Sequence, residues 1–191
     1  MIDDKKTFFI SDLHLGHENI IKYESRPFAD AAEMGKTILE RWNKTVKNDD
    51  LVILLGDVAL MPKAAIIEVL KQLHGRKWLI LGNHDRHNTV SWWQKAGFDR
   101  VFEFPIIYED FFMLSHEPVY LNEHMPYANV HGHIHSKTMT GGYYLNVSVE
   151  HLDYTPITFE EVKKRLAVNE QAQITELKKK LKQRHGKDTE L

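Results

Sequence analysis

The sequence predicts an α/β protein with a largely parallel β-sheet, helices packed against it and a second sheet after residue 100. Three apolar, β-branched runs each end in a polar cluster, as buried strands that lead into loops do: residues 6–14, 50–58 and 76–85. Segments with helical spacing separate these runs. Alternating strands and helices imply βαβ units, and therefore a mainly parallel sheet.

Three segments are predicted to be helices. Residues 30–46 carry apolar side chains at helical spacing, and residues 61–75 begin beside Pro62 and end at Gly75. Residues 88–97 are expected to form the third helix. Each helix would pack its apolar face against the sheet.

The pattern changes after residue 100. Residues 101–118 and 141–150 are predicted to form shorter strands with hairpin or loop connections, which would make the second sheet. Residues 154–166 lead into a long charged helix, and residues 176–191 are predicted to be a solvated helix end and a frayed tail. The lysines of this tail offset the helix dipole, so they need no partner to explain them.

Composition narrows the class of protein. The chain has 191 residues, 42% hydrophobic and 27% charged, which suits one globular domain. The apolar runs are too short for a membrane span and the N-terminus is charged, so we expect a cytoplasmic protein without a membrane partner. A net charge of −2 gives no indication of nucleic-acid binding. Since cysteine is absent, any metal must be held by nitrogen and oxygen.

Polar residues of the kinds that bind metals follow five predicted strands. Any one of them is more often a cap, a turn residue or a hydrogen-bonded histidine. Together they bring carboxylate, imidazole and amide groups to the sheet edge where ligands of α/β proteins usually bind, and the sequence offers no obvious arginine partner for these carboxylates. Their number exceeds the needs of one ion, which indicates two. The residues are Asp12, His14, Asp57, Asn83, His84, Asp85, His116, His133 and His135.

The stretch NVHGHIHSK, residues 129–137, has a histidine at every second position. In an extended strand this alternation places His131, His133 and His135 on one face. A row of imidazoles would pack poorly in a core but would suit a metal site. An exposed polar strand end is the alternative interpretation.

In order, the blocks DLH, GD, GNHD, H and GHIH resemble the five-block signature of the calcineurin-like metallophosphoesterase superfamily, across residues 12–135. The extended first block, residues 11–28, and residues 146–156 further resemble a small bacterial and phage-type branch. The resemblance implies a four-layer α/β/β/α sandwich of two mixed sheets flanked by helices. Residues 1–157 would form the catalytic domain, with residues 158–191 as its C-terminal helix and tail.

The resemblance also implies a role for each motif residue. The first metal would be held by Asp12, His14 and His135, and the second by Asn83, His116 and His133. Asp57 would bridge the two. His84 would be a histidine near the leaving group that binds no metal, and His131 would pack or form hydrogen bonds around the ligands. Manganese is the first expectation for both ions, and iron, zinc and nickel also suit nitrogen and oxygen ligands.

These roles predict hydrolysis of a phosphate ester by a metal-bridging hydroxide, with His84 as general acid and Asp85 orienting it. His17, Arg26 and Arg86 are candidates for substrate binding, with surface charge as the alternative. The second block reads GDVALMP rather than GDxVDRG, so it lacks the phosphate-binding arginine of protein phosphatases. We therefore expect a small phosphodiester or nucleotide-like substrate.

Two alternatives stay open. The substrate could be a phosphomonoester or a nucleic-acid end, or the fold could serve as a binding scaffold without activity. The sequence makes no prediction of oligomeric state.

Overall fold

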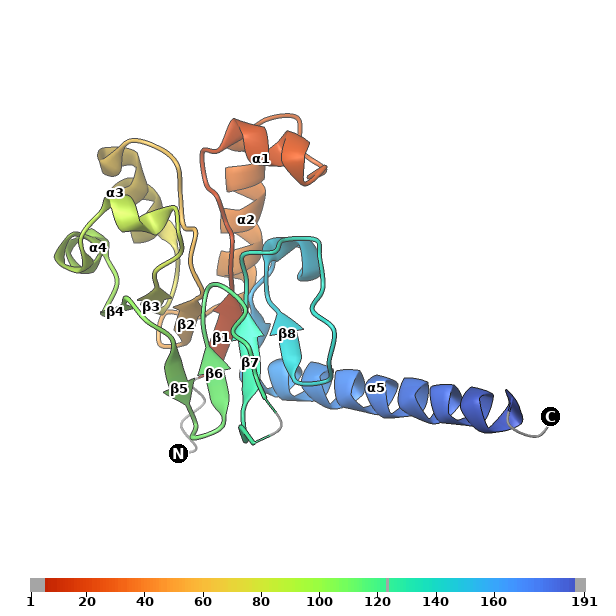
Figure 1. Cartoon of the computed structure of the whole chain (residues 1–191). Coiled ribbons are helices and arrows are strands. Elements are labelled where there is room, and N and C mark those ends of the chain that lie inside the picture. The colour runs from red at the N-terminus through yellow and green to blue at the C-terminus, as the bar shows by residue number, and fades with distance from the viewer. Residues whose placement is uncertain (1–5, 123, 188–191) are drawn as a thin grey trace.

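Two mixed β-sheets form the centre of the protein in the computed structural model, which describes residues 6–122 and 124–187 (Figure 1). From residue 174 onward, side chains are described only for Thr175 and Lys178. The first sheet has the order β4-β3-β2-β1-β9, and the second has the order β5-β6-β7-β8. The predicted pair of mixed sheets with flanking helices is therefore confirmed.

The first sheet contains the three strands predicted from apolar runs. β1, β2, β3 and β4 run parallel, and β9 pairs antiparallel with β1. The sequence did not reveal β9, because two residues carry no periodic pattern. The bounds are Thr7–Ile10 for β1, Leu51–Leu54 for β2, Arg76–Ile80 for β3, Arg100–Phe102 for β4 and Ile157–Thr158 for β9.

The second sheet comes from the C-terminal half as predicted, but it begins at β5: residues 101–102, predicted to belong to it, lie in β4 and extend the first sheet by pairing with β3. β5 and β6 form an antiparallel hairpin, whereas β6, β7 and β8 run parallel. The bounds are Ile106–Tyr108 for β5, Phe112–Leu114 for β6, Ala128–His131 for β7 and Tyr144–Asn146 for β8.

The three predicted helices form close to their predicted positions: α2 (Ala31–Thr45), α3 (Lys63–Gln72) and α4 (Val90–Ala96). The Asp30 side chain caps α2 by accepting a hydrogen bond from Glu33 N at 2.8 Å. A short helix, α1 (Glu18–Tyr23), forms where a loop was expected, and two single turns of 3₁₀ helix cover Asp85–His87 and Val149–His151.

Aromatic side chains join the two sheets. The Phe9 ring of β1 lies 5.8 Å from Tyr108 of β5, and Phe159 lies 4.9 Å from Phe112 of β6 (centroid distances). Phe159 also contacts Phe9, so strands from both sheets meet around one ring. This aromatic packing fixes the position of one sheet relative to the other, and with it the positions of the loops that follow their strands.

The long C-terminal helix α5 (Phe159–Lys187) begins in this core and then extends away from the sheets (Figure 1). Val162 and Leu166 are buried against the sheets, and Lys163, Lys164 and Val168 are exposed. The side chains of Ile174, Leu177 and Leu181 and the last residues of the predicted tail lie outside the described part. No described helix is long and apolar enough to span a bilayer.

Candidate metal centre

The loops after β1, β2, β6 and β7 are joined by backbone hydrogen bonds. Asp12 N donates to Gly56 O at 3.0 Å, and His14 N donates to Asp57 O at 3.0 Å. Gly132 N donates to His116 O at 2.9 Å, and His133 N donates to a carboxylate oxygen of Asp12 at 2.9 Å. These bonds bring the predicted ligand residues of both sheets into one region.

Asp12, His14 and His135 form the first cluster. His14 Nε2 lies 3.8 Å from Asp12 Oδ1, and His135 Nε2 lies 3.9 Å from the same oxygen. Asp12 and His14 are buried, and Asp12 Oδ1 and both His14 ring nitrogens have no hydrogen-bond partner among the described residues. Buried polar atoms without partners are unfavourable, and a cation held by these three side chains would satisfy them.

Asn83, His116 and His133 form the second cluster. Asn83 Oδ1 lies 2.9 Å from His116 Nε2 and 3.0 Å from His133 Nδ1. His116 Nδ1 donates to the carbonyl oxygen of Leu55 at 2.7 Å, which leaves Nε2 with a lone pair. The three donor atoms therefore converge on one point, as a metal site requires.

Asp57 lies between the two clusters. Its Oδ2 is 3.4 Å from His14 Nε2 and 3.5 Å from His116 Nε2, and its Oδ1 accepts a hydrogen bond from His84 N at 3.0 Å. Burial, together with the nearby carboxylates Asp12 and Asp85, raises the pKa of Asp57 to about 6. Bound cations would offset this unfavourable charge, so the carboxylate fits a bridging position.

The imidazole of His14 is in the form that binds metals. Burial, followed by the charges of His135, Arg26 and His84, lowers the pKa of His14 to about 2. The ring is therefore neutral at physiological pH and offers a free lone pair.

The backbone is left-handed at five of the seven predicted ligands. The φ angles are 59° at Asp12, 49° at His14, 56° at Asp57, 69° at His133 and 49° at His135. Such angles are uncommon for residues other than glycine and gather at functional sites.

The prediction that residues 131–135 continue one strand is wrong. β7 ends at His131, and a turn follows in which Ile134 N donates to Gly132 O at 2.8 Å. Gly132 lies so close to Ser11 and Asp12 that a side chain there would collide with both. His133 and His135 reach different clusters because the backbone turns, not because a strand alternates.

His84 lies beside the first cluster. Its ring centroid is 5.3 Å from that of His14 and 6.2 Å from that of His17. One His84 nitrogen lies within 4.8 Å of ligand atoms of His14 and Asp57. The ring is therefore close enough to meet a substrate bound at the centre, and its role as a general acid stays a prediction.

Asp85 does not orient His84, contrary to the prediction. Its buried carboxylate accepts hydrogen bonds from Asp57 N at 2.7 Å, Val58 N at 3.0 Å and Gly82 N at 2.9 Å. Burial raises the pKa of Asp85, and these three bonds counter part of the rise. The side chain turns inward and braces the loops after β2 and β3.

Arg26 is not placed to bind substrate, which overturns its predicted role. Its guanidinium is buried and forms an ion pair of 2.6 Å with Glu150. Sequence analysis missed Glu150 as a functional candidate, and its only signal was its place in the stretch 146–156. Arg86, by contrast, is exposed and shares a hollow of about 140 Å³ with His116.

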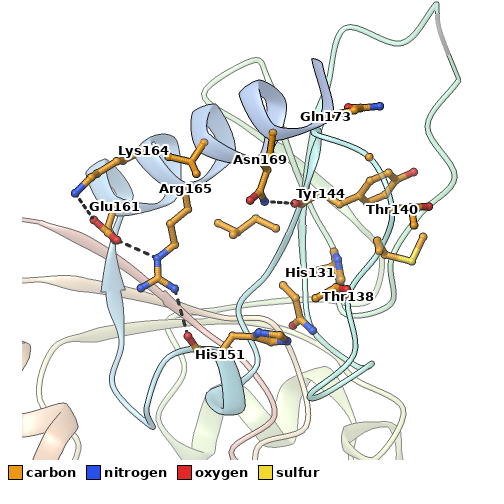
Figure 2. A pocket seen from close by; sticks show the side chains of 16 residues that line it. His131, Thr138, Thr140, Tyr144, His151, Glu161, Lys164, Arg165, Asn169 and Gln173 are labelled. Carbon is orange, nitrogen blue, oxygen red and sulfur yellow. Dashed lines mark hydrogen bonds and ion pairs between the residues drawn. The ribbon is translucent and has the colours of Figure 1, made fainter. Parts of the chain in front are cut away.

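A larger hollow, of about 790 Å³, lies between α5 and the loop before β8 (Figure 2). None of the seven predicted ligands lines it. Its walls include His131, whose Nδ1 donates to Gly132 O at 2.9 Å, and Asn146, whose amide donates to His135 O at 2.8 Å. His131 thus supports the loop that carries His133 and His135, in agreement with its predicted place outside the ligand set.

Fold and site together define an α/β protein with two adjoining candidate metal sites that share one carboxylate. The sequence pattern of the calcineurin-like phosphoesterases matches residues 5–187, and the chain belongs to this family. Hydrolase activity and metal binding are typical of its members.

Relatives are found in archaea, phages and bacteria. The uncharacterized protein MJ1445 of Methanocaldococcus jannaschii is 34% identical over 84% of this chain and 90% of its own length. The Gene 66 protein of Mycobacterium phage L5 is 41% identical over 44% of this chain and 42% of its own length. The crystal structure of the protein of unknown function AQ665 from Aquifex aeolicus superposes with a TM-score of 0.65 and 29% identity, covering 84% of this chain and 99% of that one.

Proposed function

We propose that the protein is a dinuclear metal-dependent phosphoesterase that hydrolyses a small phosphodiester or nucleotide-like substrate. One observation carries the proposal. Asp57 Oδ2 lies between His14 Nε2 and His116 Nε2, at 3.4 and 3.5 Å, so a single carboxylate joins two ligand clusters. Asp12, His14 and His135 would hold one ion, and Asn83, His116 and His133 the other, with Asp57 shared.

Two divalent ions held by these residues would supply a water of lowered pKa and would neutralise charge on the phosphate oxygens. The protein contributes four imidazoles, an amide and two carboxylates, held in place by the loops at one end of its sheets. The left-handed backbone at five ligand positions sets the ligand geometry before an ion binds. Manganese is our first choice of metal, followed by iron, zinc and nickel.

His84 would protonate the leaving group. Its half-buried ring packs at the mouth of the first cluster beside His14 and His17. A positioned general acid contributes about 10²–10⁴-fold to the rate, most of all for a leaving group that is a strong base.

Substrate would approach over the second cluster, because Asn83 is exposed and His133 is half-buried. Arg86, beside His116, is placed to pair with a phosphate oxygen. His17, whose ring lies 5.5 Å from that of His14, would contact the opposite side of the substrate.

The test is metal reconstitution followed by turnover. Protein stripped with a chelator is loaded in turn with manganese, iron(II), zinc and nickel, and metal per chain is counted alongside hydrolysis of bis-nitrophenyl phosphate and nitrophenyl phosphate. We expect two ions per chain and faster hydrolysis of the diester. Faster hydrolysis of the monoester would favour a phosphomonoesterase, and two bound ions without turnover of either ester would favour a binding scaffold. A metabolite pool incubated with the active metal form would then identify the substrate.

A further inference from the structure

We propose that Glu150 and Arg26 are positioning residues that set the metal affinity of the first cluster and leave the second cluster unaffected. The inference rests on the metal centre of the proposed function. Neither residue belongs to the ligand set, and they come from segments 124 positions apart in the chain. Together they connect His135 to the loop that carries Asp12 and His14.

One oxygen of Glu150 is the centre of this arrangement. Glu150 Oε1 accepts hydrogen bonds from Arg26 Nε at 2.9 Å and Arg26 Nη2 at 2.6 Å, and lies 3.2 Å from His135 Nδ1. The side chains of Arg26 and Glu150 are 0% and 8% exposed. A buried arginine and carboxylate must remain paired, because removing either would leave the other as an uncompensated charge.

The bond to Glu150 fixes the orientation of His135. Since a carboxylate accepts, His135 Nδ1 is the donor, and this bond directs Nε2 toward the first cluster, 3.9 Å from Asp12 Oδ1. His133, two residues away, instead presents Nδ1 to its cluster. The neighbours of each ring therefore decide which of its nitrogens faces the candidate metal site, and for His135 that neighbour is Glu150.

Arg26 holds the other side of the first cluster. Its guanidinium donates to Asp12 O at 2.9 Å and to Leu13 O at 3.1 Å. These carbonyl groups belong to the turn between the two ligands of the β1 loop, where the backbone is left-handed at both Asp12 and His14. Four hydrogen bonds from one guanidinium thus tie this strained turn to Glu150, and through it to His135.

The second cluster has separate supports. His116 is held by the carbonyl oxygen of Leu55, and the backbone of Asp57 is held by Asp85. Among the described residues, neither Glu150 nor Arg26 forms a hydrogen bond with Asn83, His116 or His133. The charges of the pair act on His14 and His135, which both belong to the first cluster, so the effect on the metals should be local.

The experiment is a calorimetric titration of metal-free protein with manganese(II). Wild type is compared with Glu150→Gln, which keeps the shape of the side chain and removes its charge, and with Glu150→Ala and Arg26→Met. His135→Ala and Asn83→Ala assign each binding step to one cluster. We expect the first-cluster step to weaken about 10–100-fold in the Glu150 and Arg26 variants, as is usual when a group that orients a ligand is lost. The second-cluster step should stay within about threefold.

Arg41→Met is the matched control, because it breaks an exposed arginine–carboxylate pair with Asp153 in the same segment as Glu150. It should change neither step. If Arg26→Met fails to fold, as judged by circular dichroism, Glu150→Gln and Glu150→Ala decide the question.

Equal weakening of both steps, or no change in the first, would overturn the proposal. The readout is independent of turnover, so the two proposals can fail separately. A wild-type protein that binds two ions without hydrolysing esters contradicts only the proposed function. A wild-type protein that binds none contradicts both.

Discussion

The two halves of the candidate metal centre offer similar donor groups in different surroundings. In the first cluster Asp12 and His14 are buried, and a buried ion pair stands behind His135. In the second cluster Asn83 is exposed and His133 is half-buried. His135 is half-buried like His133, and His116 is buried, so the first half is the more enclosed and the second, through Asn83, the more open to solvent.

For the proposed function, this difference predicts that the two clusters have different roles. The enclosed cluster is suited to retaining an ion, because its ligands are fixed and shielded from water. The open cluster is suited to exchanging water for substrate oxygens. Asp57 belongs to both halves, so changes at Asp57 test whether the halves depend on each other.

Asp57→Asn should have the largest effect. A neutral amide in place of the shared carboxylate weakens both metal sites together, so turnover should be abolished with every metal. Metal counting after dialysis and assays of nitrophenyl esters measure this. Two ions per chain with near-normal turnover would show that Asp57 does not bridge.

The same substitution should stabilise the metal-free protein at pH 7.5. The pKa of Asp57 rises from 3.8 to about 6 on folding, so the ionised group destabilises the fold above pH 6 and the penalty disappears as pH falls toward 3.8. Two pKa units correspond to about 3 kcal/mol. In thermal denaturation with a chelator present, the variant should have a higher melting temperature than wild type at pH 7.5 and the same melting temperature near pH 4. A variant that melts below wild type at pH 7.5 would contradict the cause given for the raised pKa.

His135→Ala and Asn83→Ala should separate the halves. Each variant is expected to lose the ion of its own cluster and to keep one ion per chain. Elemental analysis at equal free manganese tests this. If either variant loses both ions, the two sites are one cooperative unit, and the comparison between an enclosed and an open half no longer holds.

His84→Ala should leave metal content near that of wild type and lower the rate on an alkyl phosphodiester by about 10²-fold or more. A nitrophenyl ester should suffer less, since nitrophenolate leaves without a proton. Assays of the two esters under the same conditions show whether the loss is larger for the alkyl ester. Equal losses would assign His84 to charge stabilisation or positioning, and loss of metal would make it a ligand.

Asp85→Asn should lower stability without removing a ligand. The two carboxylate oxygens of Asp85 accept hydrogen bonds from three backbone N–H groups. The amide of asparagine has only one oxygen, so at least one of these N–H groups loses its partner. The expected loss in the free energy of unfolding is about 2–4 kcal/mol. Urea denaturation of the metal-free protein measures it, and an unchanged midpoint would show that Asp85 does not brace these loops.

Arg86→Ala should have the smallest effect, limited to the open half. Losing one exposed charge near the substrate corresponds to about 1 kcal/mol or less, so KM should rise by about fivefold at most, with metal content unchanged. Steady-state kinetics on the diester tests this. An unchanged KM would show that Arg86 is a surface charge that does not contact the substrate.

Much of the scaffold could be predicted from the sequence. Residues 30–46 were expected to be helical, and α2 covers Ala31–Thr45, because a long amphipathic period reports which face is buried. Strand β9 and helix α1 were missed, since a two-residue strand and a six-residue helix are too short to show a period.

The errors at the site have a different origin. Arg26 was interpreted as a substrate-binding cation and Asp85 as the residue that orients His84, yet both side chains turn inward to groups contributed by distant loops. The turn at His133 was interpreted as a strand because alternation alone does not reveal how closely Gly132 approaches Ser11.

The sequence by itself determined which chemical groups follow which strands. That information is local: a buried strand is recognised by its apolar run, and the residue after it is read directly. Only the tertiary structure decided which atoms of those groups meet, which nitrogen each histidine presents and which half of the centre is enclosed. These properties depend on contacts between loops that are distant in the chain, such as the one between Asp12 and His133, and on backbone angles that the two packed sheets impose.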